Sequence, residues 1–276
     1  MSAGGGSEVD PRRALWRRGS YEIAGDWFAP ASRSVLDDVA SMRAEGLDGV
    51  SLLDLACGTG AVSIEAARRG ASVVGLDLTD ELIAVARRRA AAAGVDLRLE
   101  LGDFDHLDRV VDGETFDVIT SSFGLIFAPD AAATLRGIEP HLRADGVLAV
   151  AGWDPESVFV VPDSMLALLP EVPRMVDMST WTTQVDALAR DGGWAVAATR
   201  RGDHPIAFAS VVDAADQLER WSGGWTQFLE GLDALGHGSE ARRRLRAHLS
   251  TFAETRSGGI TVTARYHTVV LRPPAR

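Results

Sequence analysis

Short apolar runs alternate with amphipathic stretches through the middle of the chain. The apolar runs predict five buried strands, at 50–55, 72–76, 97–101, 116–120 and 146–151. Between them, helical periodicity predicts crossover helices at 62–69, 81–93 and 131–142. Such alternation is typical of a parallel sheet built from βαβ units. We therefore expect an α/β core.

The sequence on either side of this core is mostly helical in pattern. Spaced apolar and aromatic positions between 15 and 44 predict amphipathic helices ahead of the first strand. Beyond residue 153, four prolines interrupt an apolar stretch, and a helical pattern resumes at 180–190. Later segments predict strands at 194–200, 206–210 and 260–271, and helices over most of 214–252 with a break near Gly236 and Gly238.

These patterns predict one folded domain with a short tail. A chain of 276 residues that is 46% hydrophobic can bury a full core. We expect residues 1–10, which are small, Gly-rich and acidic, to be a disordered tail, and residues 11–276 to form a single domain. Its parts are N-terminal helices at 11–48, a cofactor-binding core at 49–154 and a helical cap inserted at 211–255.

Composition narrows the set of partners. The 28 basic residues are all Arg and face 39 acidic residues, giving a formal net charge of −11, which disfavours a nucleic-acid substrate. The single cysteine, Cys57, cannot form an internal disulfide, and no apolar stretch is long enough to span a bilayer. We expect a soluble, cytoplasmic protein that binds neither nucleic acid nor membrane, as a monomer or a homodimer.

A small-residue turn follows the first predicted strand. The segment 52–60 reads LLDLACGTG and leads directly into a predicted helix. Because Gly58 and Gly60 lack side chains, their backbone N–H groups could approach a ligand closely at the start of that helix. This turn predicts a ligand-binding loop.

Acidic residues follow the next two strands. Asp77 ends the second strand, where a carboxylate can accept hydrogen bonds from both hydroxyls of a ribose. Asp103 and Phe104 follow the third, where they suit an adenine amino group and an adenine ring, and Ser121 to Phe123 end the fourth. Ligands of open α/β sheets bind at this carboxyl edge, so these features predict one site.

Taken together, residues 50–153 resemble the core of the class I S-adenosylmethionine-dependent methyltransferases, particularly the small-molecule branch related to ubiquinone and menaquinone methyltransferases. The resemblance implies a Rossmann-like, mostly parallel seven-stranded sheet with helices on both faces, whose last strands form an antiparallel pair. One departure is Ala56, which stands where the family has its first loop glycine.

The resemblance also assigns roles to the strand-end residues. It implies that the 54–60 stretch contacts the methionine part of S-adenosylmethionine, that Asp77 binds the ribose and that Asp103 with Phe104 contacts the adenine. A nicotinamide dehydrogenase is disfavoured because the third glycine of its fingerprint is absent at 61–63. We interpret Cys57 and Asp117 as structural. The predicted cofactor-binding residues are Asp54, Ala56, Gly58, Gly60, Asp77, Leu78, Asp103, Phe104 and Ser121.

The predicted reaction is in-line methyl transfer to oxygen, nitrogen or carbon of an apolar or aromatic small molecule, such as a quinone precursor or a specialised metabolite. Tyr21, Trp27, Phe123 and Trp153 are candidates to line the acceptor cavity, and His237 is the candidate general base. No metal is expected, since serines stand where metal-dependent relatives carry a carboxylate after the fourth strand.

Two other functions stay open at this point. The fold could be repurposed for cyclisation or decarboxylation, with the cofactor kept as a structural or electrostatic element. The chain could also be a non-catalytic cofactor-binding subunit. Release of S-adenosylhomocysteine distinguishes methyl transfer from both.

Overall fold

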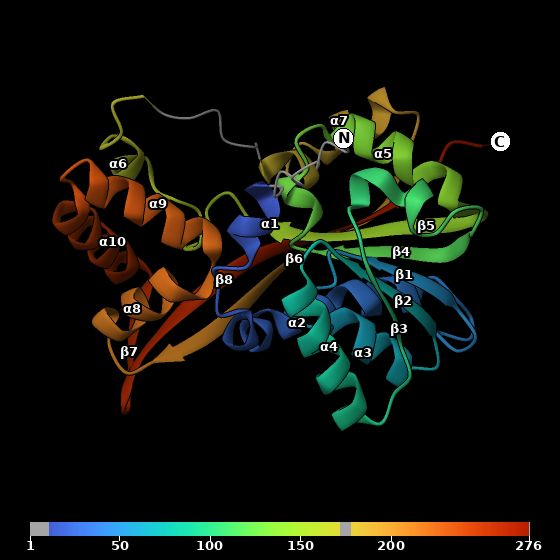
Figure 1. Cartoon of the computed structure of the whole chain (residues 1–276), viewed down its shortest axis with the longest axis horizontal. Helices are drawn as coiled ribbons and strands as arrows, with labels where there is room; N and C mark the ends of the chain where they lie inside the picture. The colour runs from blue at the N-terminus through green and yellow to red at the C-terminus, as the bar shows by residue number, and fades with distance from the viewer. Residues whose placement is uncertain (1–10, 172–177, 276) are drawn as a thin grey trace, which may run out of the picture.

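A mixed sheet of eight strands runs through the part of the chain that this computed structural model describes, residues 11–171 and 178–275 (Figure 1). The strand order is β3-β2-β1-β4-β5-β8-β6, with β7 paired to β8. The first five strands pair in parallel, and β8 runs antiparallel to its three neighbours. The strands are β1 (Ser51–Leu55), β2 (Ser72–Asp77), β3 (Arg98–Leu101), β4 (Phe116–Ser122), β5 (Leu142–Trp153), β6 (Ala195–Phe208), β7 (Ala253–Arg256) and β8 (Gly259–Arg272).

This architecture confirms the expected α/β, Rossmann-like class, with one strand more than the seven expected, the short β7. The segments expected at 194–200 and 206–210 form one continuous strand, β6, across Pro205. Proline cannot donate to a neighbouring strand, but β6 lies at the edge of the sheet and pairs only with β8 on its inner side. The edge position therefore tolerates it.

Helices cover both faces of the sheet. Figure 1 shows α2, α3 and α4 on one face and α5 and α7 on the other. The predicted helix at 131–142 ends earlier, at Ile138, and passes into a 3-10 turn that contains Pro140. The α-helices of this layered core are α2 (Tyr21–Ser41), α3 (Ala61–Arg68), α4 (Asp80–Ala93), α5 (Ala131–Ile138) and α7 (Val185–Asp191), and the 3-10 helices are η1 (Phe104–Arg109), η2 (Leu125–Phe127), η3 (Glu139–His141) and η4 (Met178–Trp181).

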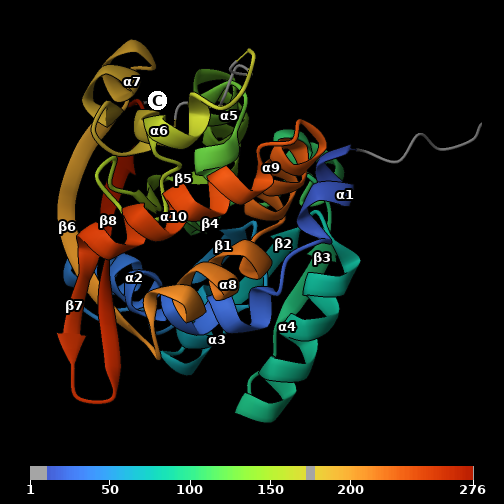
Figure 2. The same ribbon diagram turned by 90° about the vertical axis from the view of Figure 1, so that its left-hand side faces the viewer.

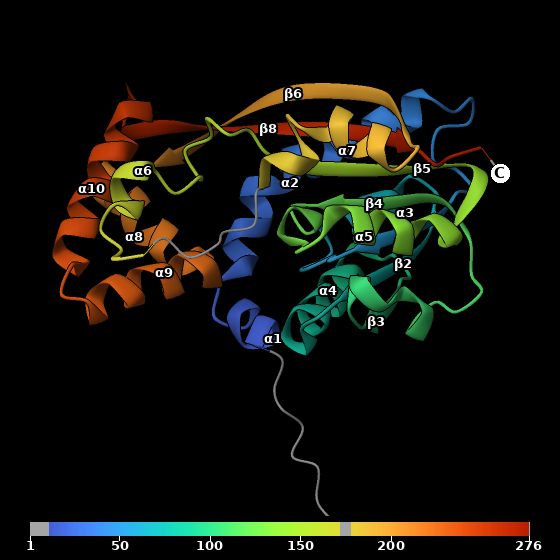
Figure 3. The ribbon, with the colours of Figure 1, turned by 90° about the horizontal axis from the view of Figure 1, so that it is seen from above.

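A second group of helices lies at the far ends of β6 and β8. The members are α6 (Asp163–Leu166), α8 (Val211–Trp221), α9 (Gly223–Ala234) and α10 (Gly238–Phe252), and the last three pack on one another (Figures 1 and 2). The chain turns between α9 and α10 at Gly236, whose φ of +78° favours glycine. The short N-terminal helix α1 (Pro11–Trp16) lies between this group and the core, in contact with α9 (Figure 3).

The core strands are buried because helices cover both faces of the sheet. In β1, for example, Leu52, Leu53 and Leu55 are fully buried. The predicted tail at 1–10 lies outside the described residues. Within 11–171 and 178–275, no α-helix combines the length and the apolarity that a membrane span requires.

At Gly19 and Gly223, the backbone of the N-terminal helical region closely approaches the backbone of the α8–α9 junction. The backbone N–H of Ser20 donates to the Arg220 carbonyl at 3.1 Å, and the N–H of Gly223 donates to the Tyr21 hydroxyl at 2.9 Å. A Cβ at Gly223 would lie 1.9 Å from the Leu15 carbonyl oxygen, and a Cβ at Gly19 would lie 2.6 Å from the Trp221 carbonyl oxygen. Only residues without side chains permit this approach of two backbones.

We expect Gly223→Ala to lower the free energy of unfolding by about 2 kcal/mol, because the new methyl group collides with backbone rather than with a movable side chain. Urea denaturation of the two proteins measures this difference. Gly224→Ala is the matched control, since its Cβ would meet nothing closer than the Ser222 Oγ at 3.5 Å. Equal stabilities for the two variants would contradict the proposed close contact.

Candidate functional site

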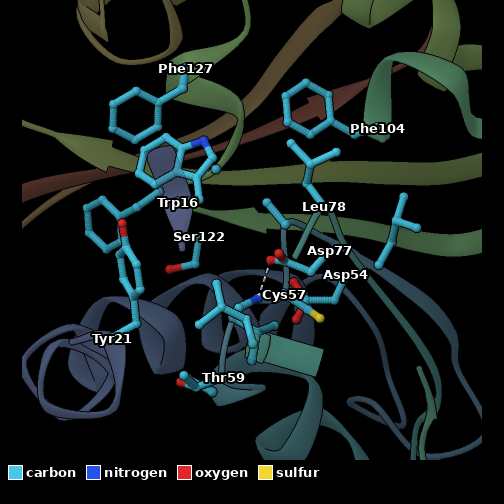
Figure 4. Close-up of a pocket in the computed structure, with 18 of the residues that line it drawn as sticks. Trp16, Tyr21, Asp54, Cys57, Thr59, Asp77, Leu78, Phe104, Ser122 and Phe127 are labelled. Carbon is cyan, nitrogen blue, oxygen red and sulfur yellow. Dashed lines mark hydrogen bonds between the residues drawn. The ribbon is translucent and has the colours of Figure 1, made fainter. Parts of the chain in front are cut away.

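A pocket opens at the carboxyl ends of β1, β2, β4 and β5 (Figure 4). Its floor comes from the loops that follow these strands. Its cover comes from α1, the first half of α2 and the α8–α9 junction, which contribute Trp16, Tyr21 and Trp221. Parallel strands all end at this edge, so residues far apart in the sequence converge here.

The turn after β1 contains two glycines in left-handed backbone conformations, which glycine adopts readily. Gly58 has φ +55°, and a Cβ built on it would meet no atom within 4 Å, so the turn opens onto space. Gly60 also has a positive φ but does not line the pocket; it lies under α4, where a Cβ would come within 3.2 Å of the Ala86 Cβ. Gly60, predicted as a cofactor contact, thus packs against α4 in this structure and does not face the pocket.

Ala56 adopts φ +54°, a conformation that disfavours any residue with a side chain. The structure accommodates its methyl group opposite Gly124, where a Cβ would lie 2.4 Å from the Ala56 Cβ. The sequence departure at Ala56 is therefore matched by a missing side chain across the loop, and Ala56 still lines the pocket.

Asp77 lies at the centre of the pocket, only 7% exposed. One carboxylate oxygen, Oδ2, accepts from the backbone N–H of Gly58 at 2.8 Å. The other, Oδ1, accepts from the Thr79 N–H at 2.9 Å and the Thr79 hydroxyl at 2.7 Å. Burial raises the pKa of Asp77 even though these donors oppose the shift. The carboxylate is thus fixed in place, and Oδ2 has capacity for a further donor from a ligand.

Asp54 lines the pocket beneath Asp77 and ties the loop to its surroundings. Its oxygens accept from the Ser63 hydroxyl at 2.6 Å and the Thr120 hydroxyl at 2.9 Å, which connects β1 with α3 and β4. Complete burial raises the pKa of Asp54 to about 6. Asp117, by contrast, accepts from the Ser51 N–H and pairs with Arg143, as the structural interpretation predicted.

One end of the pocket is formed by the turn after β3. Asp103 accepts from the Asp105 N–H at 3.0 Å and forms an ion pair with Arg12. Phe104 and Leu78, both half-buried, lie close together at this end in Figure 4. The turn therefore offers a carboxylate and two apolar surfaces to one ligand.

The other end of the pocket is aromatic. The rings of Phe123 and Trp153 stack with centroids 4.1 Å apart, and Phe28 packs against both, at 5.1 and 4.9 Å. At the mouth, Trp16 packs edge-on against Phe127 at 4.7 Å (Figure 4). Phe123 holds φ +61°, a strained value for a bulky residue that turns the chain at the end of β4.

Three further predicted site residues do not line the pocket. Trp27 packs behind the aromatic end against Phe208, and the adjacent Phe28 lines the pocket instead. The Ser121 hydroxyl is buried, donating to the Leu55 carbonyl at 3.0 Å. His237, predicted as the general base, is exposed at the start of α10 and does not line the pocket.

The differences at Trp27 and Ser121 share a cause, whereas neither neighbour of His237 lines the pocket. Adjacent residues of a strand point to opposite faces, and adjacent residues of a helix point about 100° apart, so an error of one position moves a side chain off the pocket. Ser122 faces the pocket where Ser121 was predicted. Cys57, which was excluded, also lines the pocket as a buried thiol whose pKa burial raises. The lining residues to which the sequence analysis gave no site role include Arg12 and Trp16 of α1.

Charge divides the pocket into two halves. Among the described lining residues, the ionisable Arg12, Asp54, Asp77 and Asp103 belong to the half built on the turns after β1, β2 and β3. The aromatic half carries hydroxyl groups, including those of Ser32 and Ser122, whose oxygens lie 3.2 Å apart. Across residues 11–171 and 178–275, no three His, Cys, Asp or Glu side chains gather as a potential metal site.

Part of this chain is similar in sequence to known proteins. Residues 52–146 match the family model described as "Methyltransferase domain". An uncharacterised protein of Mycobacterium tuberculosis is 32% identical over 147 residues, which are 53% of this chain and 52% of that protein. The ubiquinone biosynthesis O-methyltransferase of Actinobacillus pleuropneumoniae is 36% identical over 114 residues, 40% of this chain and 49% of the enzyme. The chain thus spans about half the length of the curated relatives that it matches.

Solved structures resemble the whole fold. The S-adenosylmethionine-dependent methyltransferase of Thiobacillus denitrificans, in complex with S-adenosylhomocysteine, aligns with a TM-score of 0.53 at 19% identity, covering 90% of this chain and 92% of that one. At this identity the likeness concerns the fold.

Proposed function

We propose that this chain, which carries a methyltransferase domain at residues 52–146, transfers a methyl group from S-adenosylmethionine to an apolar or aromatic small molecule. The observation that carries the proposal is the convergence of Gly58, Asp77 and Asp103 on one pocket. The acceptor atom is oxygen, nitrogen or carbon, and a quinone precursor or a specialised metabolite would suit the aromatic half.

The residues present fit an adenosyl ligand. The open space beside Gly58 lies next to the Asp77 carboxylate, because the Gly58 N–H is bonded to that carboxylate. We propose that Asp77 binds the ribose hydroxyls and that the Gly58 turn faces the methionine part. Asp103 would accept from the adenine amino group, with Phe104 and Leu78 on the ring.

When bound, S-adenosylmethionine supplies an activated methyl group. The chain's contribution is to align the acceptor with that group and to exclude water. Stacked rings at Phe123 and Trp153 form a wall for a flat acceptor, and Trp16 with Phe127 narrows the mouth. Tyr21 keeps its proton at neutral pH, since burial raises its pKa to about 12, and so serves as a hydrogen-bond donor rather than a base.

The proposal is tested by measuring S-adenosylhomocysteine release from S-adenosylmethionine with a panel of phenols, quinols, aromatic amines and aliphatic acceptors. We expect turnover with at least one flat aromatic acceptor. Cofactor binding without turnover on any acceptor would favour the non-catalytic subunit. Conversion of an acceptor without S-adenosylhomocysteine release would favour the repurposed cyclase or decarboxylase.

A further inference from the structure

Arg12 is the positively charged side chain among the described residues that line the pocket. It comes from α1, outside the domain segment at 52–146. Its guanidinium pairs with two carboxylates of the turn after β3, those of Asp103 and Asp105, the latter with Nη1 and Oδ2 3.1 Å apart. A side chain from the N-terminal helix therefore reaches the end of the pocket that Asp103 and Phe104 form.

The partners of Arg12 are themselves fixed. The Asp105 N–H donates to Oδ1 of Asp103 at 3.0 Å, which closes the turn. The Thr134 hydroxyl of α5 lies 3.4 Å from Oδ1 of Asp105 and donates its proton at the shorter distance of 3.0 Å to the Asp130 carbonyl. Asp105 does not line the pocket. The turn thus holds the Asp103 and Asp105 carboxylates close together, where both pair with the guanidinium.

Helix α1 crosses the pocket from one half to the other. Arg12 and Trp16 are four residues apart and so lie on the same face of the helix. Arg12 contacts the charged half, and Trp16 contacts Phe127 in the aromatic half. The helix that covers the pocket is consequently attached at both of its ends.

From this arrangement, and on the basis of the function proposed above, we infer that Arg12 is a cofactor-binding residue that closes α1 over the adenosine end of S-adenosylmethionine. Asp105 is a positioning residue that acts through Arg12. Neither Arg12 nor Asp105 is among the residues from which the sequence predicted the cofactor site.

The chemistry of the guanidinium suits this position. Arginine binds carboxylates through the edge of its planar group and can stack on an aromatic ring through its face. Held edge-on by Asp103 and Asp105, the Arg12 guanidinium can stack on an adenine whose amino group is bonded to Asp103. Each carboxylate oxygen accepts more than one hydrogen bond, so Asp103 can serve Arg12 and the adenine together.

The test is isothermal titration of S-adenosylhomocysteine into the wild-type chain and into Arg12→Gln, Asp105→Asn and Arg17→Gln. We expect Arg12→Gln to raise Kd about tenfold and Asp105→Asn to raise it by a smaller factor. Arg17 is the matched control. It follows α1 directly and also pairs with two carboxylates, of Asp80 and Glu81, but it does not line the pocket. Its substitution should change Kd less than twofold.

A fragment of the cofactor locates the effect. 5′-Methylthioadenosine keeps the adenosine but lacks the amino-acid part. Arg12→Gln should therefore raise the Kd for this fragment and the Kd for S-adenosylhomocysteine by the same factor. A loss confined to S-adenosylhomocysteine would place Arg12 on the methionine part and overturn the inference, as would equal Kd values for Arg12→Gln and Arg17→Gln. Thermal midpoints without ligand should agree among the three variants, which excludes general loosening. Failure of the wild-type chain to bind S-adenosylhomocysteine would instead reject the proposed function itself.

Discussion

Replacing Asp77 by asparagine is expected to weaken S-adenosylhomocysteine binding at least a hundredfold, since hydrogen bonds to a charged group contribute about 1.5–3 kcal/mol each. Thr79 occupies Oδ1 with two donors. The new amide nitrogen would therefore take the place of Oδ2 and point its hydrogens at the Gly58 N–H. The variant loses the acceptor for a ribose hydroxyl and also disturbs the turn that faces the cofactor. Isothermal titration measures the change in Kd.

The control for Asp77→Asn is Asp80→Asn. Asp80 lies three residues further on, is exposed, pairs with Arg17 and does not line the pocket. The Asp80→Asn substitution removes the same charge from the same region. We expect it to change the Kd for S-adenosylhomocysteine less than twofold. Far-UV circular dichroism of both variants checks that they fold. Unchanged affinity in folded Asp77→Asn would remove the ribose assignment and with it the proposed orientation of the cofactor.

Replacing Trp153 by alanine is expected to lower the free energy of unfolding by about 3–5 kcal/mol, the usual cost of truncating a buried tryptophan. Trp153 is 5% exposed, and its ring contacts those of Phe28, Phe123 and Phe159, with centroids 4.1 to 4.9 Å away. Truncation leaves a cavity that these rings cannot fill without leaving their own positions. Urea denaturation, followed by circular dichroism, measures the loss.

Trp16→Ala provides the comparison for Trp153→Ala. Trp16 is only partly buried on α1 and contacts the rings of Tyr21 and Phe127. The same truncation there should cost about 1 kcal/mol, a usual value for a single substitution. Similar losses for both variants would mean that the aromatic half is not a packed wall. The distinction bears on function, because only a rigid wall can select an acceptor by shape.

The half of the pocket built on the turns after β1, β2 and β3 could be anticipated because its residues directly follow strand ends. Gly58, Asp77 and Asp103 follow β1, β2 and β3 directly, and in a parallel sheet those ends share one edge. Apolar runs identify the strands, and the chain connectivity then places the turns. The positive φ of Gly58 and the burial of Asp77 agree with that placement.

The aromatic half could be anticipated only as a group. Tyr21, Phe123 and Trp153 line the pocket, whereas Trp27 was chosen in place of Phe28. On an amphipathic helix such as α2, both residues belong to the broad apolar face, and periodicity does not say which part of that face meets the pocket. His237 was chosen for its position in the cap, and the structure places it at an exposed turn.

The sequence by itself determined the parallel core, the edge at which the pocket opens and the acids that line it there, because these follow from local periodicity and from residues adjacent to strand ends. Only the tertiary structure decided how the pocket is covered. The contacts of Arg12 with Asp103 and of Gly223 with Tyr21 join residues 91 and 202 positions apart. Such contacts depend on how separate helices pack, and no pattern within either segment specifies them.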